Sequence, residues 1–185
     1  MIPTLPLRPR NRLAETILRA LHDPAARREL AALSAESGAR RWLAEDERRW
    51  AAPLADRARA ACAALAGRPL LAPAGDVREA LGVAATLFDA GLYFEVHELL
   101  EPHWARAQGQ TREALQGLIQ VAVGCQHLAN GNLAGARALL VEGAGRLHGT
   151  RLLGLHLDDF ARAAVAAAGA VATGAPVSTP TFPRA

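Results

Sequence analysis

Histidine and glutamate side chains gather in the segment FEVHELLE, residues 94–101. If this segment is helical, His97 and Glu101 lie one turn apart in the middle of an aromatic and apolar face, and Glu98 borders that face. Glu95 points to another side of the helix, where we expect it to be solvated. An unpaired charge on an apolar face is costly, so His97 and Glu101 must be hydrogen-bonded or bound to a ligand. The aromatic residues expected to wall this position are Tyr93, Phe94 and Trp104.

A second polar set lies on the helix predicted over residues 111–128. Three uncharged polar side chains form a stripe on one side of this helix, and no ionised side chain follows Glu113 within it. In an arginine-rich chain a solvent face would carry charge, so we expect the stripe to face protein, with the helix of residues 94–101 as its natural partner. The stripe consists of Gln116, Gln120 and His127, and Gly117 and Gly124 on its edge allow close approach of another backbone.

Three kinds of chemistry fit the six polar residues of these two helices. They can form a structural polar core that fixes helix packing in a scaffold or interaction module, because buried polar groups are normally hydrogen-bonded. They can form a metal site, in which His97 and Glu101 ligate one ion and Glu98 or His127 completes the sphere. They can also provide a metal-free glutamate–histidine pair for acid–base work. The six candidates are His97, Glu98, Glu101, Gln116, Gln120 and His127.

The ligand types indicate which metal the second interpretation implies. Glu101 stands where the HExxH zinc motif has its second histidine, and a carboxylate is a harder ligand that favours Mn²⁺ or Fe²⁺ over Zn²⁺. A hydrolase-like enzyme of either kind would have its polar residues converge on solvent. An interaction module would instead seal them and expose an apolar patch elsewhere, such as a homo-oligomer interface.

Composition predicts a single globular domain from a reducing compartment. The chain has 185 residues, of which 51% are hydrophobic, enough to bury a core without disulfides. Cys62 and Cys125 are far apart and outside any CxxC pair, which excludes a disulfide scaffold and a zinc ribbon.

The first residues lack the apolar run of a secretory signal, and the longest uncharged stretch, 114–136, contains glutamines and asparagines unlike a membrane span. We therefore expect a cytoplasmic protein without a membrane partner, and the absence of lysine among its 21 basic residues is typical of GC-rich bacterial genomes.

Alanine- and leucine-rich segments with apolar residues at i, i+3 and i+4 predict an all-α fold with no strand. The expected architecture is a helical bundle built on antiparallel helical hairpins, with N-terminal helices packed around it. Asp23 and Asp76 are good N-caps, and Pro102 must kink or end the helix that begins near residue 93. The chain divides into an N-terminal helical extension over residues 1–75, a helical core domain over 76–173, and a Pro-, Thr- and Ser-rich tail over 174–185 that is expected to be disordered.

Basic residues beside tryptophans offer a further function, nucleic-acid binding. Residues 1–75 hold 13 arginines against 8 carboxylates, and the runs Arg40-Arg41-Trp42 and Arg48-Arg49-Trp50 could contact a polyanion. Acidic residues 45–47 interrupt these runs. A solvated helix over residues 40–50, with its tryptophans docked on the core, is the favoured interpretation, and nucleic acid is not an expected partner.

The motifs occur in the order HExxE, LQGLIQ and GN between about Val77 and Leu147. This order resembles the pattern of the domain of unknown function 309 family. The resemblance implies a small all-α bundle, found in bacteria and archaea, with no established activity. It places the polar motif positions on the same six candidate residues, and it leaves the first 75 residues outside.

Overall fold

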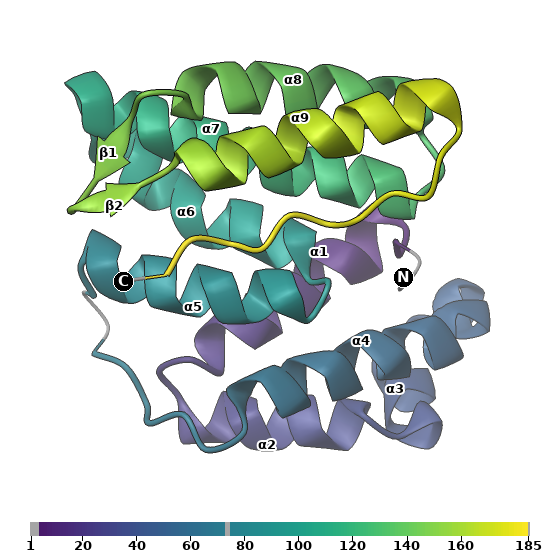
Figure 1. Cartoon of the computed structure of the whole chain (residues 1–185). Coiled ribbons are helices and arrows are strands. Elements are labelled where there is room, and N and C mark those ends of the chain that lie inside the picture. The colour runs from purple at the N-terminus through teal and green to yellow at the C-terminus, as the bar shows by residue number, and fades with distance from the viewer. Residues whose placement is uncertain (1–3, 73–74, 185) are drawn as a thin grey trace.

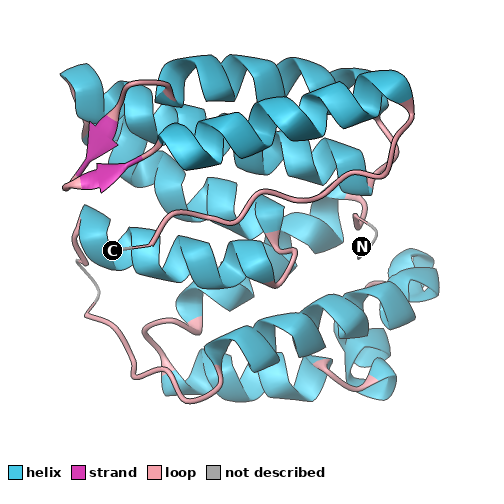
Figure 2. Ribbon diagram, in the orientation of Figure 1, coloured by secondary structure: helices cyan, strands magenta, loops and turns pink. Residues whose placement is uncertain are grey.

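The computed structural model describes residues 4–72 and 75–184 and has an all-α architecture. In sequence order the helices of these residues are α1 (Leu7–Arg19), α2 (Pro24–Leu33), α3 (Glu36–Trp42), the 3₁₀ helix η1 (Glu45–Trp50), α4 (Ala51–Leu65), α5 (Val77–Asp89), α6 (Tyr93–Arg106), α7 (Gly109–Ala129), α8 (Leu133–Leu147) and α9 (Asp158–Thr173). Two short strands, β1 (Arg151–Leu152) and β2 (Leu155–His156), form a small antiparallel hairpin before α9 (Figure 2). The predicted fold class is confirmed, although the hairpin was not expected. None of the helices in these ranges is long and apolar enough to cross a membrane.

The helices pack in two groups (Figure 1). From α5 to α9, each helix packs against the next one along the chain. The N-terminal helices α2, α3 and α4 pack on one another and occupy the lower part of Figure 1, with α1 between them and the rest of the molecule. The two groups meet where α1 contacts α6 and where α4 contacts α5.

Local sequence signals explain where the helices begin and turn. The side chain of Asp23 accepts a hydrogen bond from the amide of Ala25 with Pro24 in the first turn, and Asp76 accepts one from the amide of Glu79, as predicted. At Gly131 the backbone has φ of +73°, a left-handed conformation that lets α7 turn directly into α8. Consecutive helices therefore run antiparallel, which brings the motif helices α6 and α7 together.

Glycines bring α7 and α8 unusually close. A Cβ atom placed on Gly117 would lie 3.0 Å from the carbonyl oxygen of Gly143, and one placed on Gly143 would lie 2.8 Å from the carbonyl oxygen of Gly117. Gly124 similarly faces the backbone of Leu140. The close approach predicted for Gly117 and Gly124 is confirmed, but the approaching helix is α8, not α6.

The helix around Pro102 does not end there, and the helix predicted over residues 40–50 is interrupted. Helix α6 continues through Pro102 to Arg106, because a proline removes only one backbone donor and the helix is held by its packing against α5 and α7. The helix predicted over residues 40–50 is instead divided into α3 and η1, with Leu43 in an extended conformation between them.

The predicted disordered tail is packed across the domain in the structure. Residues 175–184 run back beneath α9 in an extended path towards α5 (Figure 1). Phe182 is 1% exposed, with its ring centroid 5.2 Å from that of Phe88 and 5.4 Å from that of Phe160. Arg184 forms an ion pair with Asp89. The expectation of disorder rested on average composition, whereas one buried aromatic side chain anchors the segment.

Candidate functional site

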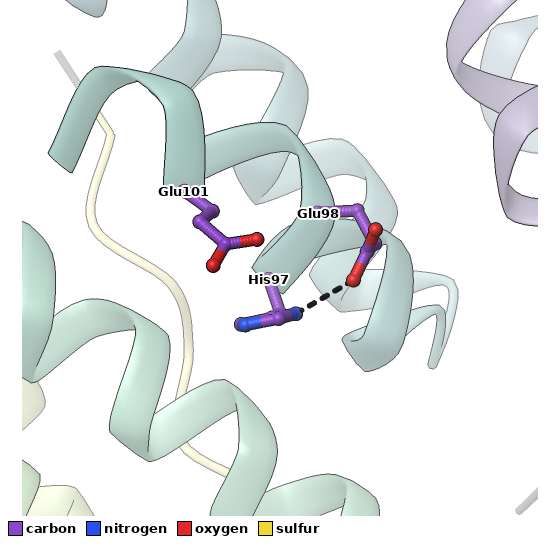
Figure 3. Close-up of side chains that lie close together, drawn as sticks. All are labelled: His97, Glu98 and Glu101. Carbon is purple, nitrogen blue, oxygen red and sulfur yellow. Dashed lines mark hydrogen bonds and ion pairs between the residues drawn. The ribbon is translucent and has the colours of Figure 1, made fainter. Parts of the chain in front are cut away.

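The side chains of His97, Glu98 and Glu101 form a cluster on α6 (Figure 3). One ligand atom from each residue lies within 4.8 Å of the others. The two carboxyl groups flank the imidazole, and Nδ1 of His97 lies 2.9 Å from Oε1 of Glu98. Helical spacing produces this arrangement, because residue i+4 returns to the side of residue i and residue i+1 borders it.

The cluster is open to solvent on one side. The side chain of His97 is 28% exposed and that of Glu98 is 37% exposed, while Glu101 is an exposed residue. These three residues therefore do not form the sealed polar core that the first interpretation of the sequence requires. When the Nδ1–H group of His97 donates a hydrogen bond to Glu98, Nε2 keeps a lone pair that can bind a cation or accept a proton.

Of the three predicted aromatic walls, Phe94 is the one whose ring stacks near the imidazole. Its centroid lies 6.1 Å from that of His97, and the guanidinium of Arg10, from α1, covers the Phe94 ring at 4.1 Å. Tyr93 packs edge-on against Phe88 instead, with centroids 4.9 Å apart, and burial raises the pKa of its hydroxyl. The Trp104 ring lies 4.1 Å from the guanidinium of Arg112, and its indole nitrogen is buried without a partner among the described residues.

The polar stripe of α7 faces α8, so the predicted packing of this stripe against α6 is wrong. Gln120 donates to Oε1 of Glu142 over 2.7 Å and accepts from Nε of Arg146 over 3.0 Å, and both partners lie on α8. His127 pairs through Nδ1 with the side chain of Asn132, at the start of α8, over 3.0 Å. A helical wheel assigns each residue a side but cannot identify the neighbouring helix, and here the glycine contacts place α8 on that side.

Five of the six candidates therefore separate into two groups. His97, Glu98 and Glu101 come together, whereas Gln120 and His127 bond towards α8. Gln116 is half-buried and has no side-chain hydrogen bond among the described residues. Hydrogen bonds from Gln120 and Arg146 lower the pKa of Glu142, so the stripe and α8 share a charged network that stabilises the hairpin of α7 and α8.

The prediction that Glu95 is solvated is wrong. Glu95 is 0% exposed and pairs with Arg57 of α4, itself 1% exposed, over 2.7 Å between Oε2 and Nη2. Nε and Nη1 of Arg57 and Oε1 of Glu95 have no partner among the described atoms. A helical wheel drawn for α6 alone assumes one buried face, but the N-terminal helices cover a second one. The available signal was Arg57 itself, which lies in the otherwise apolar side of α4 formed by Leu54, Ala58 and Ala61.

A cavity adjoins the cluster between α1 and α6. It has a volume of about 580 Å³, and Glu98 and Leu99 line it from the side of α6. A second cavity of about 480 Å³ shares Leu21, His22 and Leu99 with the first and extends to His103. Burial lowers the pKa of His103, with a smaller contribution from the charge of Arg106, so this imidazole is neutral at neutral pH. Both volumes suit a small molecule.

Cys125 and Trp42 are weaker candidates for a functional site. Burial raises the pKa of the Cys125 thiol to about 12, so it is protonated and a poor nucleophile at neutral pH. Trp42 is half-buried, lies 3.8 Å from the guanidinium of Arg12, and donates its indole proton to Glu29 over 3.1 Å. These contacts tie the Trp42 ring to α1 and α2.

These observations define an all-α protein with an open histidine–glutamate cluster on one of its central helices. Residues 81–139 match the family model of a domain of unknown function, DUF309, so the chain contains a DUF309 domain over this range. No curated protein and no solved structure matches the chain. The matched range spans most of α5, all of α6 and α7, and the beginning of α8, and it contains all six candidate residues. It excludes α1 to α4, and these include the helix that supplies the other wall of the cavity beside Glu98.

Proposed function

We propose that this protein binds a divalent metal ion through His97 and Glu101 and uses it for hydrolysis. The observation that carries the proposal is the set of three potential ligand atoms within 4.8 Å on the open side of α6. In this arrangement Nε2 of His97 and a carboxylate oxygen of Glu101 are the ligands. Glu98 accepts the Nδ1 proton and so fixes the orientation of the imidazole, as carboxylates do for many metal-binding histidines.

The donor set favours Mn²⁺ or Fe²⁺ over Zn²⁺, because the carboxylate of Glu101 is a harder ligand than the second histidine of the HExxH zinc motif. These two protein ligands leave several coordination positions for water or substrate, which is typical of catalytic metal sites. The cavity beside Glu98 supplies space for a substrate. A metal-free alternative uses the same residues, with His97 as the base and Glu98 as the group that orients it.

The test is metal-dependent stability of the full chain. Protein purified without an affinity tag is analysed for bound elements, and its thermal stability is measured with chelator and after addition of Mn²⁺, Fe²⁺ or Zn²⁺. The parent is expected to lose stability with chelator and to regain it with metal, because an ion that binds only the folded state stabilises it. His97→Ala and Glu101→Ala should be insensitive to both treatments, whereas Glu36→Ala, which removes an exposed carboxylate on α3, should behave like the parent.

An unchanged parent, free of stoichiometric metal and indifferent to chelator, would remove the metal proposal. The metal-free alternative, with His97 as the base, would then be tested by the pH dependence of hydrolysis. His97→Ala should abolish any hydrolysis, and Glu98→Gln should only weaken it.

A scaffold or interaction module is the second candidate, because α8 presents an apolar surface. Leu133 is 52% exposed and Val141 is 51% exposed, and a shallow depression lies around Ala138. Such a surface suits a homo-oligomer. Sedimentation velocity over a range of concentrations tests this candidate, and a monomer at every concentration, unchanged by Val141→Glu, excludes self-association through α8.

A further inference from the structure

Three arginines from distant parts of the chain surround one cavity that is separate from the histidine–glutamate cluster. Arg68 follows α4, Arg78 lies in the first turn of α5, and Arg184 belongs to the C-terminal segment. The cavity has a volume of about 280 Å³, and no carboxylate among residues 4–72 and 75–184 lines it. Its remaining walls are Leu81, Gly82, Thr86, Leu153 and Leu155.

Neutral groups hold two of these arginines in place. Arg68 donates through Nη1 to the hydroxyl of Thr86 over 2.6 Å, and Arg78 donates through Nη2 to the carbonyl of Leu153 over 3.3 Å. Within residues 4–72 and 75–184, neither guanidinium forms an ion pair with a carboxylate. Arg184 is paired with Asp89. As far as the structure describes the chain, the cavity wall thus carries two uncompensated positive charges, and guanidinium N–H groups remain available as donors.

The backbone around the cavity is also fixed. Arg27 donates to the carbonyl of Arg68 over 2.7 Å and to that of Pro69 over 3.2 Å, which anchors the segment that carries the first arginine. Leu153, at the tip of the β1–β2 hairpin, has φ of +52° and is the one non-glycine residue with positive φ in the described part of the chain. Strained positions of this kind persist where the surroundings impose them, and they are frequent at ligand sites.

We propose that this cavity binds a small phosphate monoester. Guanidinium groups match phosphate oxygens with paired N–H donors, and the two uncompensated charges match the charge of a phosphate dianion. The leucine side chains provide an apolar wall for the organic part of the ester. The volume accommodates one phosphate group with a small organic substituent.

The test measures binding of phenyl phosphate to the full chain by calorimetry and thermal shift, with inorganic phosphate and phenol as the two halves of the probe. Phenyl phosphate should bind more tightly than inorganic phosphate, and phenol should not bind. Arg68→Gln and Arg78→Gln should each weaken phenyl phosphate binding by about tenfold or more, because each removes a charge-assisted hydrogen bond. Arg41→Gln, an exposed arginine of α3 outside the cavity, is the control with the same change in net charge and should bind like the parent.

A second pair of variants distinguishes loss of binding from loss of folding. Gly82 lies on the exposed side of α5, and a Cβ atom there would have Nη2 of Arg68, 4.0 Å away, as its nearest neighbour. Gly82→Ala should therefore bind phenyl phosphate, whereas Gly82→Glu should place a carboxylate among the arginines and abolish binding. Equal binding to the Ala and Glu variants, or no binding to the parent, overturns the proposal. Equal affinity for phenyl phosphate and inorganic phosphate would reduce the site to one for free phosphate and exclude the ester.

Discussion

The two nitrogens of His97 have different surroundings, and this difference gives the residue its chemical interest. Nδ1 is held by Glu98, while Nε2 is the nitrogen left for a ligand. The sequence was sufficient to find this cluster, because a turn of helix imposes the spacing of His97 and Glu101. It was not sufficient for Glu95, two residues away, because the burial of Glu95 depends on Arg57 in a helix that is distant in sequence.

Asp158 gives a residue-scale prediction for the pH dependence of stability. The backbone amide of Gly149 donates to Oδ1 of Asp158 over 2.8 Å and holds the pKa of this carboxyl below its ordinary value of 3.8, with smaller contributions from the neighbouring cationic side chains. Because the pKa is lowered in the folded state, the contribution to stability is complete above the unfolded value and is lost as the pH falls through the folded pKa. Asp158→Ala should melt at a lower temperature than the parent at neutral pH, and the difference should shrink in acid.

The control for this prediction is Asp159→Ala. The side chain of Asp159 is 92% exposed and pairs with Arg162 on the surface of α9, so its removal should change the melting temperature little. A gap between Asp158→Ala and the parent that widens as the pH falls below the ordinary carboxyl value would contradict the assignment.

At the scale of elements, the ion pair of Arg57 and Glu95 joins α4 to α6. Removal of one partner leaves a buried charge uncompensated, so Arg57→Met or Glu95→Leu alone should lower the free energy of unfolding by about 3–5 kcal/mol. The double variant removes both charges and should be close to the parent or more stable. Urea denaturation of the four proteins measures the coupling between the two residues. If the double variant loses as much stability as both single variants together, the pair does not act as a unit.

The α7–α8 contact gives a second prediction at this scale, from Gly143 and Gly145, which lie on different sides of α8. A methyl group on Gly143 would collide with the backbone of Gly117 and with Val121, so Gly143→Ala should lower the free energy of unfolding by about 1–3 kcal/mol. A methyl group on Gly145 would meet nothing within 4 Å. Gly145→Ala should therefore raise stability by up to about 1 kcal/mol, because alanine favours the helix. Thermal denaturation of both variants tests the packing, and equal effects would contradict it.

Element boundaries were predictable where a local signal sets them. Asp23 and Asp76 cap α2 and α5 as expected, since a capping side chain acts within its own turn. Of the two outcomes predicted for Pro102, a kink or an end, the end does not occur, because the cost of one missing donor is local, whereas the packing that offsets it comes from other helices. The partner of α7 was not predictable from its own residues, because Gly143, which admits α7, lies on α8.

At the scale of the whole molecule, the all-α class follows from helical periodicity along the chain, but the course of residues 175–184 does not. Phe182 completes a cluster of aromatic rings with Phe88 and Phe160. Phe182→Ala should lower the free energy of unfolding by about 3–5 kcal/mol, the usual effect of removing a buried phenylalanine. Thr181→Ala, at the exposed neighbouring position, should be close to neutral in the same denaturation experiment. Similar melting of both variants would indicate that the segment does not stabilise the domain.

The packed C-terminal segment is equivalent to a ligand that is covalently tethered to its binding site. A tether of this length holds the aromatic ring at an effective concentration of the order of millimolar, so a weak intrinsic affinity is enough to keep it bound. After cleavage beyond Gly174, the same contact would become an ordinary bimolecular equilibrium, and the position of Phe182 beside Phe88 would be open to the equivalent segment of a second molecule. Exchange of this segment between two copies would preserve every contact that it makes within one copy, which is the condition for a domain-swapped dimer.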